Sequence, residues 1–188
     1  RVAIVTGGAN GIGRGLVDAA LARGMRVLAV DRDAPGLERL AAGRAGQPLS
    51  IAVCDVRNPD AIAALADDAF ARMGAVHLLF NNAGEVTTGP IWRHTPEDLA
   101  DLFALNVLAV GNAVHHFLPR MLASGEPGLI VNTASAGGVV TAPGLGAYQA
   151  SKHAVVGYTE SLYRDLAAAG AQVSAAVVCP GAVDTDIM

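Results

Sequence analysis

The pattern that most constrains the fold is an alternation of short β-branched runs with longer amphipathic stretches along all 188 residues. Glycines follow several of the amphipathic stretches, as expected where helices end. Strands alternating with helices predict a parallel sheet with right-handed crossovers, in a doubly wound α/β fold with helices on both faces. The predicted strands are 2–6, 26–30, 49–53, 76–80, 129–133 and 172–178, and the predicted helices 11–23, 34–45, about 60–73, 96–123 and 148–169.

Composition agrees with one domain of this kind. The chain is 52% hydrophobic and only 16% charged, as expected when parallel strands are covered on both faces. Its length fits a single domain over residues 1–188, with no linker or repeat. Cys54 and Cys179 lie in apolar runs and match no metal spacing, so we expect two buried free thiols and no metal site.

Charge and hydropathy narrow the possible partners. The formal net charge of −4 provides no basic field for nucleic acid or anionic lipid. No uninterrupted apolar run reaches the roughly 18 residues of a membrane span, so we expect no transmembrane helix. The first seven residues are typical of a strand that runs into a turn rather than of a signal peptide. These features predict a cytoplasmic protein without nucleic-acid or membrane partners.

A glycine-rich loop at residues 6–13, Thr-Gly-Gly-Ala-Asn-Gly-Ile-Gly, joins the first strand to the first helix. Glycines let the backbone approach a pyrophosphate, and the helix N-terminus offers free N–H groups. The spacing departs from the common G-x-G-x-x-G, because Leu16 stands where a third small residue is expected. The loop is therefore either a dinucleotide-binding turn or a tight turn without a ligand.

The second strand is followed by Asp31, 20 residues after Gly11. A carboxylate there can accept hydrogen bonds from the ribose of adenosine and repels a 2′-phosphate, which favours NAD over NADP. Arg32 follows at once and Arg14 opens the first helix, so NADP stays possible. The alternative is that Asp31 is a solvated turn residue or a helix cap.

Polar residues also follow the third and fourth strands. Asp55 either contacts an adenine or begins a turn. The run Asn-Asn-Ala-Gly at 81–84 suits a backbone bent beside a ligand, although it also makes an ordinary turn. Because ligands of such folds bind beyond the carboxyl ends of the strands, these loops are candidates for the site.

The most informative chemical pair is Tyr148 and Lys152, four residues apart on one face of a predicted helix. Lys152 is the only lysine among 13 basic residues. A fixed positive charge favours a neighbouring phenolate, and a compact ammonium reaches ribose hydroxyls. Ser135, just after the fifth strand, offers a hydroxyl to a carbonyl oxygen. The alternatives are an exposed lysine, a core-facing tyrosine and a serine that caps a turn.

Taken together, these motifs resemble the short-chain dehydrogenase/reductase family. The glycine loop, the 81–84 run, Ser135, Tyr148-x-x-x-Lys152 and Pro180-Gly181 follow in one order over essentially the whole chain. The resemblance implies a Rossmann-like fold and an NAD(P)-dependent oxidoreductase. Such an enzyme transfers a hydride between a nicotinamide cofactor and a secondary alcohol or ketone.

The resemblance also implies a catalytic tetrad made of Asn106, Ser135, Tyr148 and Lys152. Tyr148 would be the general acid/base, and Lys152 would favour its phenolate and hold the nicotinamide ribose. Ser135 would position the substrate oxygen. Asn106, an expensive polar group in an apolar helix, would support Lys152 through a helix irregularity and water.

The cofactor-binding residues implied by the resemblance lie in the same loops. Glycines would line the pyrophosphate, Asp31 would bind the adenosine ribose, and Thr185 would contact the nicotinamide carboxamide. The complete set is Gly7, Asn10, Gly11, Ile12, Gly13, Asp31, Arg32, Asp55, Val56, Asn82, Ala83, Gly84, Tyr148, Lys152, Pro180, Gly181, Val183 and Thr185.

Several questions stay open at the level of sequence. Family members usually continue beyond the position of Met188, so we expect the C-terminal substrate segment of the family fold to be missing. Two other functions remain: a non-catalytic dinucleotide sensor and a structural subunit that binds nothing. We expect a homodimer or homotetramer through helices 96–123 and 148–169. Loops 85–95 and 138–145 are apolar enough for a hydrophobic substrate, with Trp92 either at the pocket or simply packed.

Overall fold

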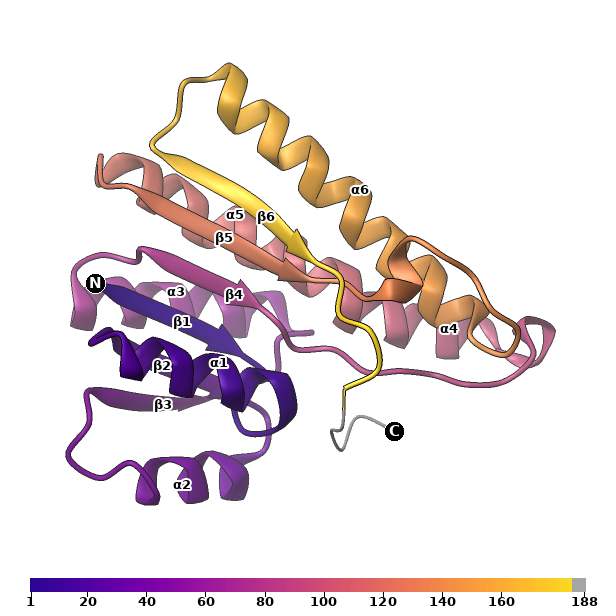
Figure 1. The fold of residues 1–188 in the computed structure, drawn as a ribbon, viewed down its shortest axis with the longest axis horizontal. Coiled ribbons are helices and arrows are strands. Elements are labelled where there is room, and N and C mark those ends of the chain that lie inside the picture. Colours follow the sequence, from indigo (N-terminus) through magenta and orange to yellow (C-terminus); the bar gives the residue numbers. More distant parts are fainter. Residues whose placement is uncertain (184–188) are drawn as a thin grey trace.

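The structure is a computed structural model, and it describes residues 1–183. Its centre is a parallel sheet in the order β3-β2-β1-β4-β5-β6 (Figure 1). The strands are β1 (Val2–Thr6), β2 (Arg26–Asp31), β3 (Leu49–Val53), β4 (Leu78–Asn81), β5 (Gly128–Thr133) and β6 (Val173–Val178).

Helices pack on both faces of the sheet (Figure 1). One core joins the sheet to α1 and α2, and another joins it to α3 and α5, with α6 packed beside α5. This arrangement confirms the Rossmann-like doubly wound α/β fold. The helices are α1 (Gly11–Ala22), α2 (Ala34–Ala42), α3 (Pro59–Met73), α4 (Pro96–Phe103), α5 (Ala109–Ala123) and α6 (Gly146–Ala168), with short 3₁₀ turns η1 (Ile91–Arg93) and η3 (Ala136–Gly138).

The central strand β1 shows why the chain has a low share of charged residues. All five residues of β1 are buried. Ile4 belongs to the core with α3 and α5, and Val5 to the core with α1 and α2, because successive side chains of a strand point to opposite faces. A strand covered on both faces needs apolar residues at every position.

The predicted helix over 96–123 is interrupted. The structure divides it into α4, a π-helical turn η2 (Ala104–Leu108) and α5. Thr95 begins the helix as predicted, in a capping box with Asp98. The wider turn contains Asn106, which is 1% exposed, and π-helical turns occur frequently at functional sites.

The stretch Pro96–Ala123 is also long and apolar enough, by length and composition, to cross a membrane. In the structure it serves as a core element. Ala109, Phe117 and Met121 are buried among residues of α3 and the sheet. Packing inside the protein accounts for part of its apolar character, since 44% of the apolar window is buried.

One expectation about the cysteines is wrong. Cys54 is buried, and burial raises the pKa of its thiol. Cys179 is exposed, because it follows β6, the outermost strand of the sheet within residues 1–183, at the point where the chain leaves the sheet. Val178, the last residue of β6, is already 42% exposed.

Candidate active site

The site lies where the carboxyl ends of the strands meet at one edge of the sheet. β1 lies between β2 and β4, and β5 follows β4. Since all neighbouring strands are parallel, the glycine loop (residues 7–13), Asp31, the 82–85 loop and Ser135 leave the sheet along this edge. Ligands of doubly wound folds bind in this crevice.

The glycine loop is packed so tightly that a side chain is excluded at Gly7 and at Gly13. Gly7 has φ +65°, and a Cβ there would lie 2.9 Å from the Ala83 Cα. A Cβ on Gly13 would lie only 1.9 Å from the Gly7 carbonyl oxygen. The loop therefore packs directly between the first turn of α1 and the end of β4.

The N-terminus of α1 has the features of an anion-binding site. The Asn10 side chain makes no capping bond to α1 within residues 1–183, and instead donates to Asp33 Oδ2 at 3.3 Å. The N–H groups of the first turn, at Gly11, Ile12 and Gly13, thus have no side-chain cap. The helix dipole adds a partial positive charge there, so the loop fits the pyrophosphate of a dinucleotide.

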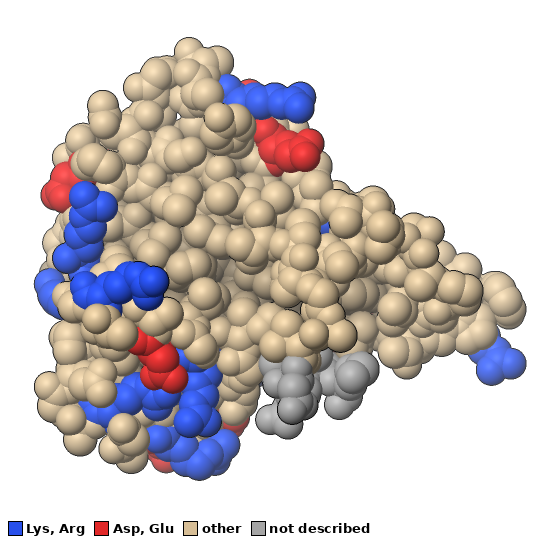
Figure 2. All heavy atoms as spheres, in the orientation of Figure 1, with Lys and Arg blue, Asp and Glu red and all other residues tan. Residues whose placement is uncertain are grey.

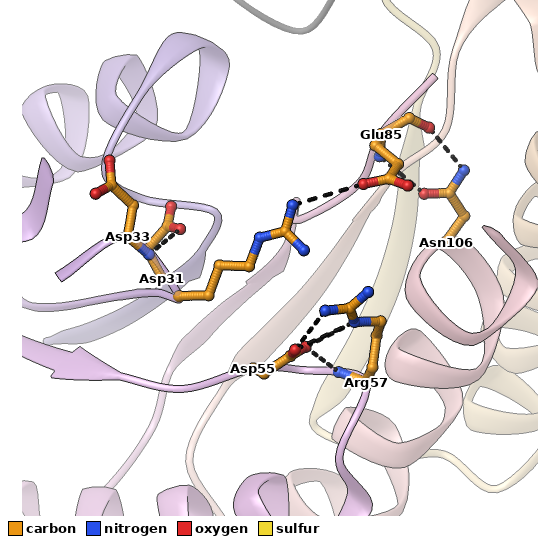
Figure 3. A network of polar contacts seen from close by, with 7 residues as sticks. Asp31, Asp33, Asp55, Arg57, Glu85 and Asn106 are labelled. Atoms are coloured by element: carbon orange, nitrogen blue, oxygen red, sulfur yellow. Dashed lines mark hydrogen bonds and ion pairs between the residues drawn. The ribbon is translucent and has the colours of Figure 1, made fainter. Parts of the chain in front are cut away.

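Asp31 is held in a defined orientation at the end of β2 (Figure 3). Its Oδ2 accepts from the Ala9 N–H and its Oδ1 from the Asp33 N–H, each at 3.1 Å. The neighbouring Arg32 forms an ion pair with Glu85, with Nη2 and Oε2 3.7 Å apart. Asp31 and Arg32, although adjacent in sequence, therefore bond to different partners.

Asp55 and Val56 have structural partners of their own. The Asp55 carboxylate accepts side-chain hydrogen bonds from Arg57, the shortest at 2.6 Å. These bonds lower the pKa of the Asp55 carboxyl. Val56 is 7% exposed and packs in the core with α3 and α5. Asp55 thus borders the crevice while it is paired with Arg57. Val56 exposes little side-chain surface to the crevice.

The loop after β4 is fastened to the end of β1. Thr6 Oγ1 accepts hydrogen bonds from the N–H groups of Asn82 at 3.0 Å and Ala83 at 3.1 Å. The Asn82 side chain donates to the Thr6 carbonyl oxygen at 3.1 Å. Thr6 was not predicted as a site residue, although it is the first residue of the glycine-rich motif at 6–13.

Asn106 connects three segments from within the π-helical turn. Its amide nitrogen donates to the Glu85 carbonyl oxygen and to Ser151 Oγ, both at 3.0 Å, and its Oδ1 accepts from the Glu85 N–H at 3.1 Å. Ser151 Oγ donates to the Tyr148 carbonyl oxygen at 2.6 Å. The buried amide is fully bonded, and it fixes the 82–85 loop against α6.

Lys152 is a buried cation beside this amide. It is 4% exposed, and its Nζ donates to the Thr133 carbonyl oxygen at 3.0 Å. Burial lowers the pKa of Lys152 to about 8. A Cβ on Gly84 would lie 3.0 Å from Asn106 Oδ1 and 3.2 Å from Lys152 Nζ, so glycine is needed where these two groups converge.

Ser135 and Tyr148 both lie near Gly137, and Lys152 lies beside the Tyr148 ring. The Lys152 Nζ lies 5.8 Å from the centroid of the Tyr148 ring. A Cβ on Gly137 would lie 3.5 Å from both Ser135 Oγ and Tyr148 Cε1. The four residues of the predicted tetrad, Asn106 among them, are thus brought together from η2, the end of β5 and α6.

The segments around these residues are mostly apolar. The Gly89 N–H donates to the Gly144 carbonyl oxygen at 2.8 Å, which joins the 85–95 and 138–145 loops. Trp92 is 81% exposed, so it is not simply packed. On the face shown in Figure 2, charged side chains gather over α1 and α2, whereas the projection that carries these loops is nearly free of charge.

The loop after β6 reaches the same region. The Ala136 N–H, next to Ser135, donates to the Pro180 carbonyl oxygen at 2.8 Å. Gly181 and Val183 follow on the surface. Thr185 lies outside the described residues. Within residues 1–183, no group of three or more acidic, histidine or cysteine side chains is arranged to hold a metal ion.

A buried polar chain behind the site was not predicted. Asn81 Nδ2 donates to Asn132 Oδ1 at 2.8 Å, and Asn132 Nδ2 donates to Thr159 Oγ1 at 2.9 Å. It links β4 and β5 to α6, the helix that carries Tyr148. Asn81 belongs to the 81–84 run that was predicted to bend beside a ligand, but its bond to Asn132 was not predicted.

The fold and the site define a nicotinamide-dependent oxidoreductase with a tyrosine and a lysine beside the dinucleotide crevice. The family model described as short chain dehydrogenase matches residues 1–188. The chain belongs to this short-chain dehydrogenase/reductase family and is an NAD(P)-dependent oxidoreductase acting on CH–OH groups.

Named relatives and solved structures agree with this assignment. A 1-deoxy-11-beta-hydroxypentalenate dehydrogenase of Streptomyces avermitilis is 39% identical over 97% of this chain and 68% of that protein. A short chain dehydrogenase/reductase from Burkholderia phymatum, solved in complex with NAD, is 41% identical with TM-score 0.97, over 100% of this chain and 67% of that one. A 3-ketoacyl-(acyl-carrier-protein) reductase from Brucella melitensis, solved with NADH, is 30% identical with TM-score 0.93, over 100% and 77%.

Proposed function

We propose that this chain transfers a hydride between NAD and a secondary alcohol or ketone, with Tyr148 as the general acid/base. The observation that carries the proposal is the convergence of Ser135, Tyr148 and Lys152 beside Asn106, at the sheet edge where the glycine loop lies. A protein that only senses a dinucleotide has no need for a buried lysine beside a tyrosine.

Proton transfer is assigned to the Tyr148 hydroxyl. The Lys152 ammonium, 5.8 Å from the ring centroid, stabilises negative charge that develops on the Tyr148 oxygen during proton transfer. Below its pKa of about 8, Lys152 carries the charge that this role needs. The phenolate takes the hydroxyl proton of an alcohol in oxidation, and the phenol returns one to the substrate oxygen in reduction.

The remaining residues orient the reactants. The Ser135 Oγ accepts from the Gly137 N–H at 3.1 Å, which leaves its hydroxyl proton to donate to the substrate oxygen. Asn106 holds the 82–85 loop and α6 in register, so that Lys152 keeps its position. When bound, the nicotinamide cofactor supplies the hydride chemistry, and the protein contributes orientation and proton transfer.

NAD is the preferred cofactor in this proposal. The glycine loop takes the pyrophosphate, and the fixed carboxylate of Asp31 accepts from the adenosine ribose and repels a 2′-phosphate. The solved relatives that hold NAD and NADH support a nicotinamide dinucleotide. Similar affinities for NADH and NADPH would contradict the role given to Asp31.

We further propose a cytoplasmic homodimer or homotetramer assembled through α4, α5 and α6. These helices and η2 expose large apolar side chains: Leu108, Leu122, Tyr158 and Tyr163. Such residues suit a surface that another copy covers. Light scattering at micromolar concentration tests this assembly, and a monomer would contradict it.

The experiment that tests the function is incubation of the protein with NAD⁺ and a panel of secondary alcohols, with NADH formation followed spectroscopically. The account predicts turnover of at least one alcohol. The rim of the site is apolar, so hydrophobic alcohols are expected to react faster than charged ones. Tight NADH binding without turnover of any alcohol would favour the sensor instead.

A further inference from the structure

An ion pair joins two strand ends on either side of the glycine loop. Arg32 follows β2, Glu85 follows β4, and β1 lies between these strands. The Arg32 Nη2 and Glu85 Oε2 atoms are 3.7 Å apart, and the two side chains are 56% and 43% exposed. The pair is therefore accessible to solvent and lies beside the proposed cofactor crevice.

Glu85 is held at this place by its backbone. Its N–H and its carbonyl oxygen both bond to the Asn106 amide, at 3.1 and 3.0 Å. Figure 3 shows Asn106 beside the Glu85 backbone, with the Glu85 carboxylate in a separate ion pair. A substitution that changes only the Glu85 carboxylate leaves both backbone bonds possible.

Two neighbouring charged side chains of this edge have other partners. Arg57 donates its side-chain hydrogen bonds to Asp55. The Asp31 carboxylate accepts from two backbone N–H groups. Within residues 1–183, Glu85 is the only ion-pair partner of Arg32. The guanidinium next in sequence to Asp31 is thus directed to Glu85.

We propose that Glu85 is a cofactor-specificity residue, which favours NAD over NADP by engaging the Arg32 guanidinium. A 2′-phosphate beside Asp31 would need a nearby cation, and arginine is well suited to bind phosphate. Arg32 is placed to supply that cation, and Glu85 competes for it. The inference rests on the proposed function, in which Asp31 binds the adenosine ribose.

The expected effect is modest. An exposed ion pair of this kind changes an equilibrium by roughly two- to fivefold. Asp31 keeps its charge when Glu85 is neutralised, so NADH should still bind more tightly than NADPH. The quantity to follow is therefore the ratio of the two affinities.

The test is fluorescence titration of NADH and NADPH, which requires no known substrate. It compares the wild-type protein with Glu85→Gln, Arg32→Gln and the double variant. Glu85→Gln should improve NADPH affinity relative to NADH by roughly two- to fivefold at low salt. In the Arg32→Gln background, Glu85→Gln should leave the ratio of NADPH affinity to NADH affinity unchanged, because there is no Arg32 guanidinium to release.

Asp101→Asn is the matched control, because Asp101 is exposed and, like Glu85, acts electrostatically on Arg57, but it is not an ion-pair partner of Arg32 within residues 1–183. It should leave the ratio of affinities unchanged. The inference is overturned if Glu85→Gln does not move the ratio, or if it moves the ratio equally without Arg32. An Asp101→Asn effect of the same size would also overturn it. If the wild-type protein binds neither dinucleotide, the proposed function itself fails.

Discussion

Burial of Lys152 lowers the stability of the folded protein when its side chain is protonated. It is 4% exposed, and burial lowers its pKa from 10.5 to about 8. A shift of this size corresponds to about 3 kcal/mol against the charged form. The folded protein carries this cost wherever Lys152 is protonated, which is consistent with a residue retained for chemistry.

Replacement of Lys152 by methionine should therefore remove activity without lowering stability at pH 7. The unfolded state keeps the lysine proton up to about pH 10.5, whereas the folded state releases it near pH 8. The wild-type protein should gain stability relative to Lys152→Met as the pH rises through this window, by about 3 kcal/mol. Thermal unfolding of both proteins between pH 7 and pH 10.5 measures this difference. A variant less stable at pH 7, with no dependence on pH, would contradict the assignment.

Gly13 and Gly15 form a matched pair within α1. A Cβ on Gly13 would lie 1.9 Å from the Gly7 carbonyl oxygen, whereas one on Gly15 would meet no atom within 4 Å. Gly13→Ala should displace the loop and abolish dinucleotide binding. Gly15→Ala should keep binding and stabilise the helix by about 0.5–1 kcal/mol. NADH titration and thermal unfolding test the pair, and equal behaviour of the two variants would argue against a tightly packed loop.

Ser135 at a strand end, and Tyr148 and Lys152 on one helix face, were the most predictable part of the site. Ser135, Tyr148 and Lys152 were chosen from their spacing and from the segments they follow, and the structure brings them together. The pairing of Glu85 with Arg32 could not be predicted, because it depends on two long side chains that meet across 53 positions of sequence.

At the scale of elements, the long interrupted helix contributes to the site through its π-helical turn η2, which contains Asn106. Asn106→Ala removes the amide that bonds Glu85 and Ser151. Unsatisfied buried groups should lower stability by about 1–3 kcal/mol, and turnover should fall because α6 loses its link to the 82–85 loop. Asn112→Ala in α5 is the control, since Asn112 is only partly buried. Comparable losses in both variants would show that the turn has no special role.

Helical periodicity predicted residues 96–123 as one helix because the apolar spacing continues through η2, and only the family resemblance implied a helix irregularity at Asn106. The wider turn depends on contacts made by Asn106 to a loop 21 residues earlier, which a local pattern does not contain. The other helix and strand limits were predicted within three residues. The exposure of Cys179 was missed because an apolar run does not reveal that its strand lies at the sheet edge.

At the scale of the molecule, a dinucleotide would join loops from both halves of the sheet. The loops after β1 and β2 contact its adenosine side in this account, and those after β4, β5 and β6 its nicotinamide side. A ligand that binds only the folded state at 100 times its Kd adds about 2.7 kcal/mol of stability. For a chain of this size, NADH should raise Tm by about 5–10 °C. No shift at millimolar NADH would favour a structural subunit that binds no nucleotide.

The most direct test of the central claim is a comparison of Tyr148→Phe with the wild-type protein, using NAD⁺ and the best alcohol of the panel. The substitution removes only the hydroxyl that is assigned to proton transfer. The account predicts that turnover falls by about 10²–10⁴-fold, while NADH binds with comparable affinity. Turnover that survives in Tyr148→Phe would contradict the assignment of Tyr148 as the general acid/base.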